Sequence, residues 1–201
     1  MTTNGKKHNH DDVYHLKYKI AISGSADTSM CAPDALEKTE ELGRLIAEHG
    51  MVLVTGATTG APYWAAKGAK KAGGFVIGIS PASSKAHHMK TYRLPVDYHD
   101  LIIYTGFGYS GRNLLFTRAA DAIVTTCGRI GTLNEVTDAF EDQKPQGVLT
   151  ATGGTTDLID EILKEARRGS GKVVFDDNPK ALIEKLIAVL QEEDKDLEEA
   201  A

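Results

Sequence analysis

The stretch CGRIGTLNE, residues 127–135, places small residues and a carboxylate in an order suited to binding an anion and acting beside it. It follows the apolar run 122–124 and precedes residues 136–140, which have a helical pattern. Glycine and threonine at a helix start hold anions through backbone N–H groups and a hydroxyl. Glu135 is then either a catalytic carboxylate or an acid that complements the helix dipole, an effect of about 0.3–1 kcal/mol.

Four other segments rich in Gly, Ser and Thr also follow expected strands. They are residues 23–30, 55–63, 105–112 and 150–156. Several such loops at one sheet edge indicate a phosphate-bearing ligand, although any one of them can be glycine-rich for turn geometry alone. The chain has no Gly-Lys-Ser/Thr P-loop and no G-x-G-x-x-G fingerprint after its first strand, which disfavours dinucleotide binding of the dehydrogenase kind.

Short apolar runs alternate with helical patterns and supply the elements that would position these loops. Strands are expected at 18–25, 51–56, 75–80, 101–106, 121–126, 146–153 and 172–176; helices are expected at 33–50, 61–74, 111–120, from about Glu135, at 157–168 and at 178–190. Strands that are apolar throughout must be covered on both faces. The pattern predicts an α/β fold with a doubly wound, mostly parallel, Rossmann-like sheet and helices on both faces, whose ligand lies beyond the carboxyl ends of the strands.

The composition fits a single domain. We expect a flexible polar leader at 1–17, the nucleotide-binding domain at 18–191 and an acidic tail at 192–201. A net charge of −5 argues against a nucleic-acid partner. The chain lacks both an apolar run long enough to span a membrane and a secretory pattern, so we expect no membrane partner and a cytoplasmic location. Cys31 and Cys127 lie far apart and suggest neither a zinc site nor a disulfide framework.

The sequence ADAIVTTCGRIGTLNE, residues 120–135, resembles the LOG family of the SLOG Rossmann-like superfamily, often labelled "possible lysine decarboxylase". That family has an Ala-Asp-Ala strand followed by Pro-Gly-Gly-x-Gly-Thr-x-x-Glu. The matching residues here are Gly128, Gly131, Thr132 and Glu135. Arg112 stands nine residues before Asp121, where the family has an Arg-Lys pair, and residues 67–82 also look like the family. The resemblance covers residues 19–190.

The resemblance implies hydrolysis of the N-glycosidic bond of nucleoside 5′-monophosphates, without a cofactor, in a homodimer or homotetramer. Glu135 would stabilise the oxocarbenium-like state and position water, and Arg112 would orient the ribose phosphate. The expected phosphate- and ligand-binding residues are Gly24, Ser25, Gly56, Thr58, Thr59, Gly60, Gly128, Arg129, Gly131 and Thr132. The alternative for Arg112 is a surface arginine at a helix start. Tyr63, Trp64, Phe107 and Tyr109 are the candidates for stacking on a base.

Departures from the family pattern leave a second function open. The family's proline is Cys127, its second glycine is Arg129 and the lysine of its Arg-Lys pair is Asn113. Similar folds include non-enzymatic molybdenum cofactor carrier proteins, so the alternative is a nucleotide or pterin-nucleotide carrier. Arg129 either supplies a positive charge or points to solvent, and Cys127 would need a nearby base to act as a nucleophile. The histidines in the long loop 81–100 form either a lid or, as we favour, a surface group.

Overall fold

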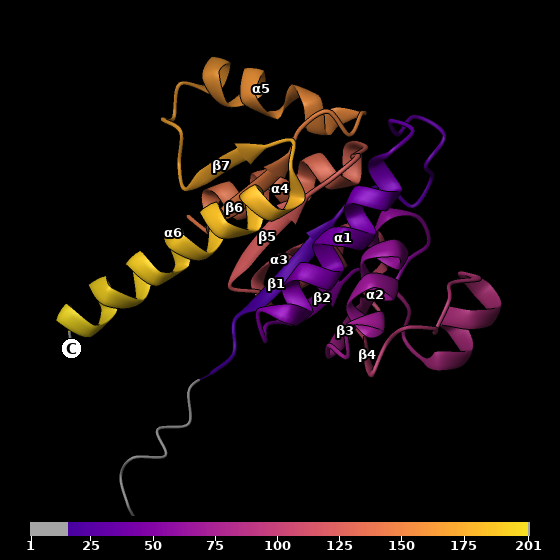
Figure 1. The fold of residues 1–201 in the computed structure, drawn as a ribbon. Helices are drawn as coiled ribbons and strands as arrows, with labels where there is room; N and C mark the ends of the chain where they lie inside the picture. Colours follow the sequence, from indigo (N-terminus) through magenta and orange to yellow (C-terminus); the bar gives the residue numbers. More distant parts are fainter. Residues whose placement is uncertain (1–15, 201) are drawn as a thin grey trace, which may run out of the picture.

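The computed structural model describes residues 16–200 and contains a seven-stranded, entirely parallel sheet (Figure 1). The strands are β1 (Lys19–Ser23), β2 (Val52–Thr55), β3 (Val76–Ser80), β4 (Leu101–Tyr104), β5 (Ala122–Thr125), β6 (Gln146–Leu149) and β7 (Val173–Asp176). Their spatial order is β4-β3-β2-β1-β5-β6-β7, so the order reverses between β1 and β5. The predicted parallel sheet is confirmed. The expected leader falls almost entirely outside the described residues.

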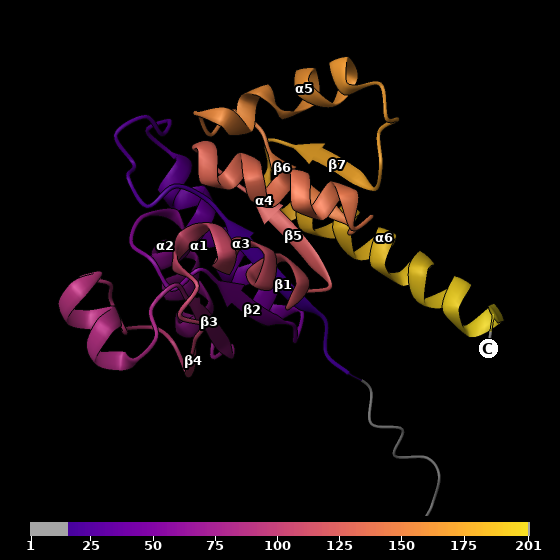
Figure 2. The ribbon, with the colours of Figure 1, turned by 180° about the vertical axis from the view of Figure 1, so that it is seen from behind.

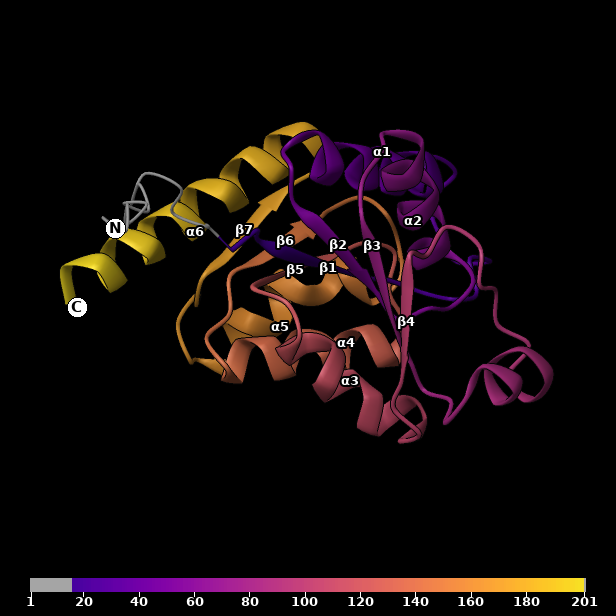
Figure 3. The same ribbon diagram turned by 90° about the horizontal axis from the view of Figure 1, so that it is seen from below.

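Helices cover both faces of this sheet, as predicted. They are α1 (Ala35–Glu48), α2 (Ala61–Lys71), α3 (Gly108–Arg118), α4 (Ile130–Glu141), α5 (Ile159–Ala166) and α6 (Pro179–Ala200). Figure 3 shows α1, α2 and α6 on one side of the strands and α3, α4 and α5 on the other. Figure 2 gives the view from the α3–α4 side. No helix in residues 16–200 is long and apolar enough to cross a membrane.

The central strand β1 contributes to the core on both faces. Ile20 and Ile22 pack in the cluster beneath α1, α2 and α6, whereas Ala21 packs in the cluster beneath α3 and α4. All three side chains are fully buried. This two-sided burial explains why the strand is apolar at successive positions, because a strand with one wet face would alternate.

Helices α1 and α2 approach each other unusually closely. A Cβ atom on Gly43 of α1 would stand 1.9 Å from the carbonyl oxygen of Ala65, and one on Gly68 of α2 would stand 1.9 Å from that of Glu40. Each glycine therefore accommodates the backbone of the opposite helix. This contact fixes α2, and with it the loop between β2 and α2 that reaches the sheet edge.

The helix boundaries differ from the predictions by a few residues at most ends, and three of the differences concern the site or the tail. Helix α3 begins at Gly108, before the predicted start, and α4 begins at Ile130, so Glu135 lies in its second turn. Helix α6 begins at the predicted Pro179, with the Asn178 side chain accepting hydrogen bonds from the backbone N–H groups of Lys180 and Ala181 at 3.0 and 3.1 Å. It continues to Ala200, so the predicted acidic tail is helical.

The long connection between β3 and β4 contains a short π-helical turn, η1 (His87–Thr91). Our preferred surface assignment is wrong for His88, which is fully buried between Ser80 Oγ at 2.8 Å and the Pro95 carbonyl oxygen at 2.9 Å. His99 is also largely enclosed and contacts Thr55 Oγ1 at 2.7 Å. Burial lowers the pKa of His99. These two histidines anchor the connection to β2 and β3.

The expectation of no disulfide is wrong. Cys31 and Cys127 form a disulfide, with their Cα atoms 5.4 Å apart. Sequence separation misled the prediction because β1 and β5 are neighbouring parallel strands. Their carboxyl ends lie at the same sheet edge, so the segments that follow them meet there.

Candidate functional site

A cavity of about 400 Å³ lies at the carboxyl ends of β1 and β5, where the strand order reverses. Ligands of doubly wound sheets bind at this type of position. The residues that line it are Gly24, Ser25, Ala26, Asp27, Thr58, Tyr109, Arg112, Asn113, Arg129, Ile130, Gly131, Thr132 and Glu135. Four loop regions that are distant in the sequence thus meet around one cavity.

The two predicted catalytic residues form an ion pair in this cavity. Nη1 of Arg112 lies 3.4 Å from Oε1 of Glu135, and each residue is only 6% exposed. Arg112 extends from α3 and Glu135 from α4. Since Arg112 is buried and Glu135 lies beyond the first turn of its helix, neither the surface-arginine nor the first-turn-acid alternative holds.

Burial dominates the electrostatics of this pair. It raises the pKa of Glu135, while Arg112 and a hydrogen bond from Ser23 act in the opposite direction. Burial also lowers the pKa of Arg112, against the attraction of Glu135. Nε of Arg112 has no hydrogen-bond partner among the described residues. The guanidinium therefore keeps at least one buried donor that its neighbours do not satisfy.

Two polar neighbours of Glu135 were missing from the predicted site. Ser23, the last residue of β1, donates its hydroxyl hydrogen to Oε2 of Glu135. The Asn113 amide, with its nitrogen turned toward the cavity, donates to Oε1 of Glu135 at 3.0 Å and to the Tyr109 carbonyl at 2.9 Å. The position of Ser23 at the end of the central strand was the available signal. Asn113 follows Arg112 directly, at the position of the family's lysine.

Arg129 lies at the start of α4 and reaches across the mouth of the cavity. Its Nη1 lies 3.1 Å from Oδ2 of Asp27, and both side chains are about half exposed. Of the two expectations for Arg129, the structure supports a charge at the cavity rather than one directed only to solvent. Gly131 and Thr132 line the cavity on the first turn of α4, as predicted. Asp27 was not predicted.

Four predicted ligand residues do not line the cavity but contact residues that do. They are Gly56, Thr59, Gly60 and Gly128. A Cβ atom on Gly56 would stand 2.2 Å from Nη1 of Arg112, so this glycine leaves room for the guanidinium. Gly60, with φ of +71°, lies against the Ser25 carbonyl, and Thr59 Oγ1 donates to the Ala26 carbonyl at 3.2 Å. Gly128 packs against Thr132.

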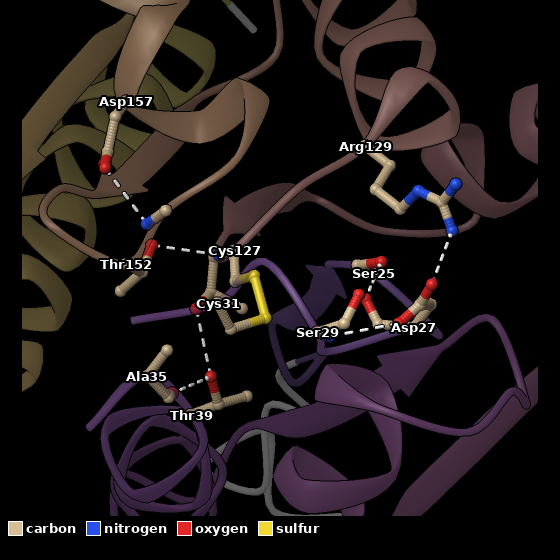
Figure 4. The surroundings of a disulfide bond; sticks show 12 residues. Ser25, Asp27, Ser29, Cys31, Ala35, Thr39, Cys127, Arg129, Thr152 and Asp157 are labelled. Carbon is tan, nitrogen blue, oxygen red and sulfur yellow. Dashed lines mark hydrogen bonds and ion pairs between the residues drawn. A yellow bond between two sulfur atoms is a disulfide. The ribbon is translucent and has the colours of Figure 1, made fainter. Parts of the chain in front are cut away.

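The disulfide joins the two segments that carry the cavity-lining residues Asp27 and Arg129 (Figure 4). Cys127 is fully buried, and its backbone N–H donates to Oγ1 of Thr152 at 2.9 Å. The segment after β6 therefore supports the cavity wall without lining it. Because Cys127 is bonded to Cys31, it holds no free thiol, which removes the considered nucleophile.

Tyr109 is the only aromatic residue lining the cavity in the described part of the chain. It lies one turn before Arg112 on α3, so both side chains occupy the same side of that helix. Its ring packs edge-on against Tyr92, with centroids 5.4 Å apart. Tyr92 packs in the same way against His87, at 5.0 Å. The connection between β3 and β4 thus supports one wall of the cavity.

The described residues contain no group of three or more His, Cys, Asp or Glu side chains placed to hold a metal ion. Asp121, left out of the predicted site, lies at the opposite edge of the sheet and pairs with Lys19 at 2.8 Å. The side chains that line the cavity supply hydroxyl, amide and guanidinium groups around one buried carboxylate.

A known protein family contains this chain. The model of the SLOG cluster4 family matches residues 17–183, most of the chain. The chain belongs to the SLOG cluster4 family. The match includes both halves of the ion pair, the disulfide and all of the residues lining the cavity.

Proteins similar to this SLOG cluster4 chain include members of both groups expected from the motif. It is 32% identical, over 135 residues, to a cytokinin riboside 5′-monophosphate phosphoribohydrolase of Mycobacterium tuberculosis, covering 63% of this chain and 68% of that protein. The molybdenum cofactor binding protein of Rippkaea orientalis is 32% identical, with a TM-score of 0.71 over 87% of this chain and 98% of that one. The molybdenum cofactor carrier protein of Chlamydomonas reinhardtii is 30% identical, with a TM-score of 0.67 over 88% and 99%.

Proposed function

We propose that the chain hydrolyses the N-glycosidic bond of a nucleoside 5′-monophosphate, releasing free base and ribose 5-phosphate. The observation that carries this proposal is the buried Arg112–Glu135 pair facing the cavity. The relationship to a phosphoribohydrolase supports the same reaction.

A buried ion pair calls for a functional reason because it seldom stabilises a fold. Removing both charges from water costs several kcal/mol, and replacement by apolar residues is often neutral or stabilising by about 1–4 kcal/mol. Arg112 and Glu135 are almost inaccessible, and their contact is long for a hydrogen bond. Retaining them at the cavity is advantageous if a substrate uses the carboxylate.

The cavity residues can divide the reaction between them. Breaking the bond between C1′ and the base nitrogen leaves the electron pair on the base, which takes up a proton, while water adds hydroxide to C1′. Glu135 would stabilise the positive charge on the ribosyl group and orient the water. Arg112 would keep the carboxylate ionised and use its free donor for a sugar or phosphate oxygen.

Phosphate and base would occupy opposite parts of the cavity. The 5′-phosphate would lie at the amino-terminal turn of α4, close to Gly131, Thr132 and Arg129. That turn offers free backbone N–H groups and partial positive charge. The base would stack on Tyr109, the aromatic wall of the cavity.

Incubation with AMP, GMP, CMP, UMP and cytokinin riboside 5′-monophosphates tests this function, with free base and ribose 5-phosphate separated by chromatography. We expect release from at least one nucleotide. Glu135→Gln should lower kcat by about 100-fold or more, since it removes the charge that opposes the oxocarbenium. Glu161→Gln, an exposed glutamate on α5, is the matched control and should retain full activity. Absence of release from every nucleotide by folded protein would refute the proposal.

The structural likeness to molybdenum cofactor proteins supports a second candidate, a pterin-nucleotide carrier without turnover. A carrier needs the cavity and its anion-binding turn but not the negative charge of Glu135. Under this alternative, the ligand would raise the melting temperature of wild type and of Glu135→Gln equally. Free base would never be released.

A further inference from the structure

The residues at two positions that depart from the family motif are both linked to the same short segment. Cys127 replaces the motif's proline and is bonded to Cys31; Arg129 replaces a glycine and pairs with Asp27 at 3.1 Å. Both partners belong to residues 26–31, which connect β1 to the start of α1 and which we call the β1–α1 segment. Figure 4 shows the two links side by side, both joining this segment to the turn that leads into α4.

The β1–α1 segment forms one side of the cavity but is weakly held by packing. Ala26 and Asp27 line the cavity, and both are exposed. Met30 is 45% exposed, so the segment has no buried apolar anchor of its own. Its base is fixed at Ser25, whose N–H donates to the Cys127 carbonyl at 2.8 Å. Beyond that point, the disulfide, the Asp27–Arg129 ion pair and the Thr59–Ala26 hydrogen bond hold it across the cavity. At its far end, a backbone bridge joins Cys31 to Gly153, and the N–H of Ala32 donates to the Thr152 carbonyl at 2.9 Å.

The covalent link matters more than the ionic one. Arg129 and Asp27 have side chains that are 52% and 54% exposed, and an ion pair that is this exposed to water contributes little to stability. A phosphate bound at the first turn of α4 would also compete with Asp27 for Arg129. With ligand present, the disulfide would then be the principal link from the segment to the α4 turn.

We propose that the Cys31–Cys127 disulfide sets the ligand affinity of the cavity, so that binding depends on the redox state of this pair. In the oxidised protein the β1–α1 segment is held in its binding position. In the reduced protein the part between Ser25 and Cys31 is less restrained, and a ligand must order it on binding, which lowers affinity. The inference shares with the proposed function only that the cavity binds a phosphorylated ligand; it does not require turnover.

The redox step needs a dithiol reductant. A thiolate of the reductant attacks Sγ of Cys31, which is partly exposed, whereas Cys127 is fully buried. The Sγ–Sγ bond breaks and Cys127 leaves as a thiolate that takes up a proton. The second thiol of the reductant then displaces Cys31, so two protein thiols form as the reductant becomes a disulfide. Two electrons and two protons are transferred in total.

Ribose 5-phosphate is a suitable probe because it has no N-glycosidic bond and is therefore not a substrate of the proposed reaction. Its affinity is measured by calorimetry for protein oxidised or reduced with dithiothreitol, and thiols are counted by alkylation and mass spectrometry. The chain has only two cysteines, so each thiol found belongs to this pair. We expect at least fivefold weaker binding after reduction, recovery on reoxidation, and faster amide exchange in residues 26–31. Equal affinity and equal exchange in both states would overturn the proposal.

Variants separate the disulfide from other effects of the reductant. Cys31→Ser should bind like reduced wild type and should not respond to dithiothreitol. Asp27→Asn removes the ionic link alone and should keep most of the redox response; loss of that response would contradict the dominant role of the disulfide. If ribose 5-phosphate and AMP bind in neither state, the proposed function fails. Amide exchange then decides this inference separately, since unchanged exchange on reduction would overturn it.

Discussion

The carboxyl group of Glu135 has three close polar neighbours and almost no contact with solvent. Ser23 donates to one oxygen, and Arg112 and Asn113 lie beside the other. Burial nonetheless raises the pKa of the carboxyl, because the surrounding protein solvates the charge less well than water does. The acid is therefore placed where a change of protonation would alter the chemistry of the cavity.

The pH dependence of activity should report this pKa. Because the ionised carboxylate is the reactive form, kcat/KM should rise with pH through a value above about 4.3, the usual pKa of a glutamate. Ser23→Ala removes a hydrogen bond that favours the ionised form, so the acid limb should move to higher pH. Ser170→Ala, at an exposed position, should leave the profile unchanged. An acid limb that does not move in Ser23→Ala would contradict this role of Ser23.

The pKa shift of Glu135 also fixes the sign of its effect on stability. A carboxyl whose folded pKa is raised contributes most below its unfolded pKa, and that contribution is lost as the pH rises through the folded pKa. Glu135 therefore favours the folded state more at acidic pH than at neutral pH.

The resemblance to the LOG motif was enough to predict much of the site, but not the pairs that complete it. It predicted Arg112 and Glu135, and the cavity contains both. Asp27 had no signal of its own, because a lone aspartate in a polar loop resembles any turn residue. Its role depends on Arg129 lying opposite, which only the three-dimensional arrangement reveals.

At the scale of elements, the α1–α2 contact places the loop that carries Thr58. Gly43 and Gly68 each face a backbone carbonyl of the other helix at a separation that excludes any side chain. In the sequence they appear only as glycines within helical patterns, which are ordinarily destabilising. The close packing of α1 against α2 explains why these two positions are glycine.

Gly43→Ala and Gly68→Ala should each lower the free energy of unfolding by about 1–3 kcal/mol, since the added methyl group forces two backbones apart. Urea denaturation measures the loss. Gly131→Ala is the matched control: its Cβ would meet nothing within 4 Å, and alanine favours a helix. That variant should be unchanged or slightly more stable. Equal effects at all three positions would contradict the packing explanation.

Other elements were predictable to the extent that their pattern is local. The apolar strands and the Asn178 cap follow from neighbouring residues and are confirmed. The last turns of α6 were assigned to a separate acidic tail because of their composition. Contacts with distant parts of the chain hold them: Glu193 pairs with Lys172, and Asp194 accepts a hydrogen bond from Tyr18.

For the whole molecule, the disulfide closes a large covalent loop. It joins residues separated by 96 positions, and the loop contains the four strands β2, β3, β4 and β5 and the helices α1, α2 and α3. Cross-linking positions this far apart restricts the unfolded chain, which in the chain-entropy model stabilises the fold by about 4–5 kcal/mol, although typical values are about 2–4 kcal/mol.

Cys31→Ser combined with Cys127→Ser should therefore lower the melting temperature of the oxidised protein by about 5–15 °C. Calorimetry of wild type with and without dithiothreitol should give a similar difference, and the double variant should not respond to the reductant. A melting temperature that is equal in oxidised wild type and in the double variant would show that the link does not stabilise the fold.

The fold class could be predicted as a whole, whereas the strand order could not. Alternation of apolar strands and helices indicates a parallel sheet but does not show which strands are neighbours. Knowing that β1 lies between β2 and β5 would have placed Cys31 and Cys127 at one edge. It would also have placed Ser23 beside Glu135. The disulfide and the missed polar contact thus share one cause.

The position of β1 at the centre of the sheet has a consequence for synthesis of the protein. Its partner β5 pairs with it in the register Ile20 to Ala122 and is made about a hundred residues later. At translation rates of about 5–20 residues per second, that interval lasts roughly 5–20 s. During it, Cys31 has no partner thiol within residues 16–126, and the backbone N–H and C=O groups of β1 that will pair with β5 lack their partners. The nascent chain should depend most on protection from aggregation, and on the redox conditions around it, in this interval.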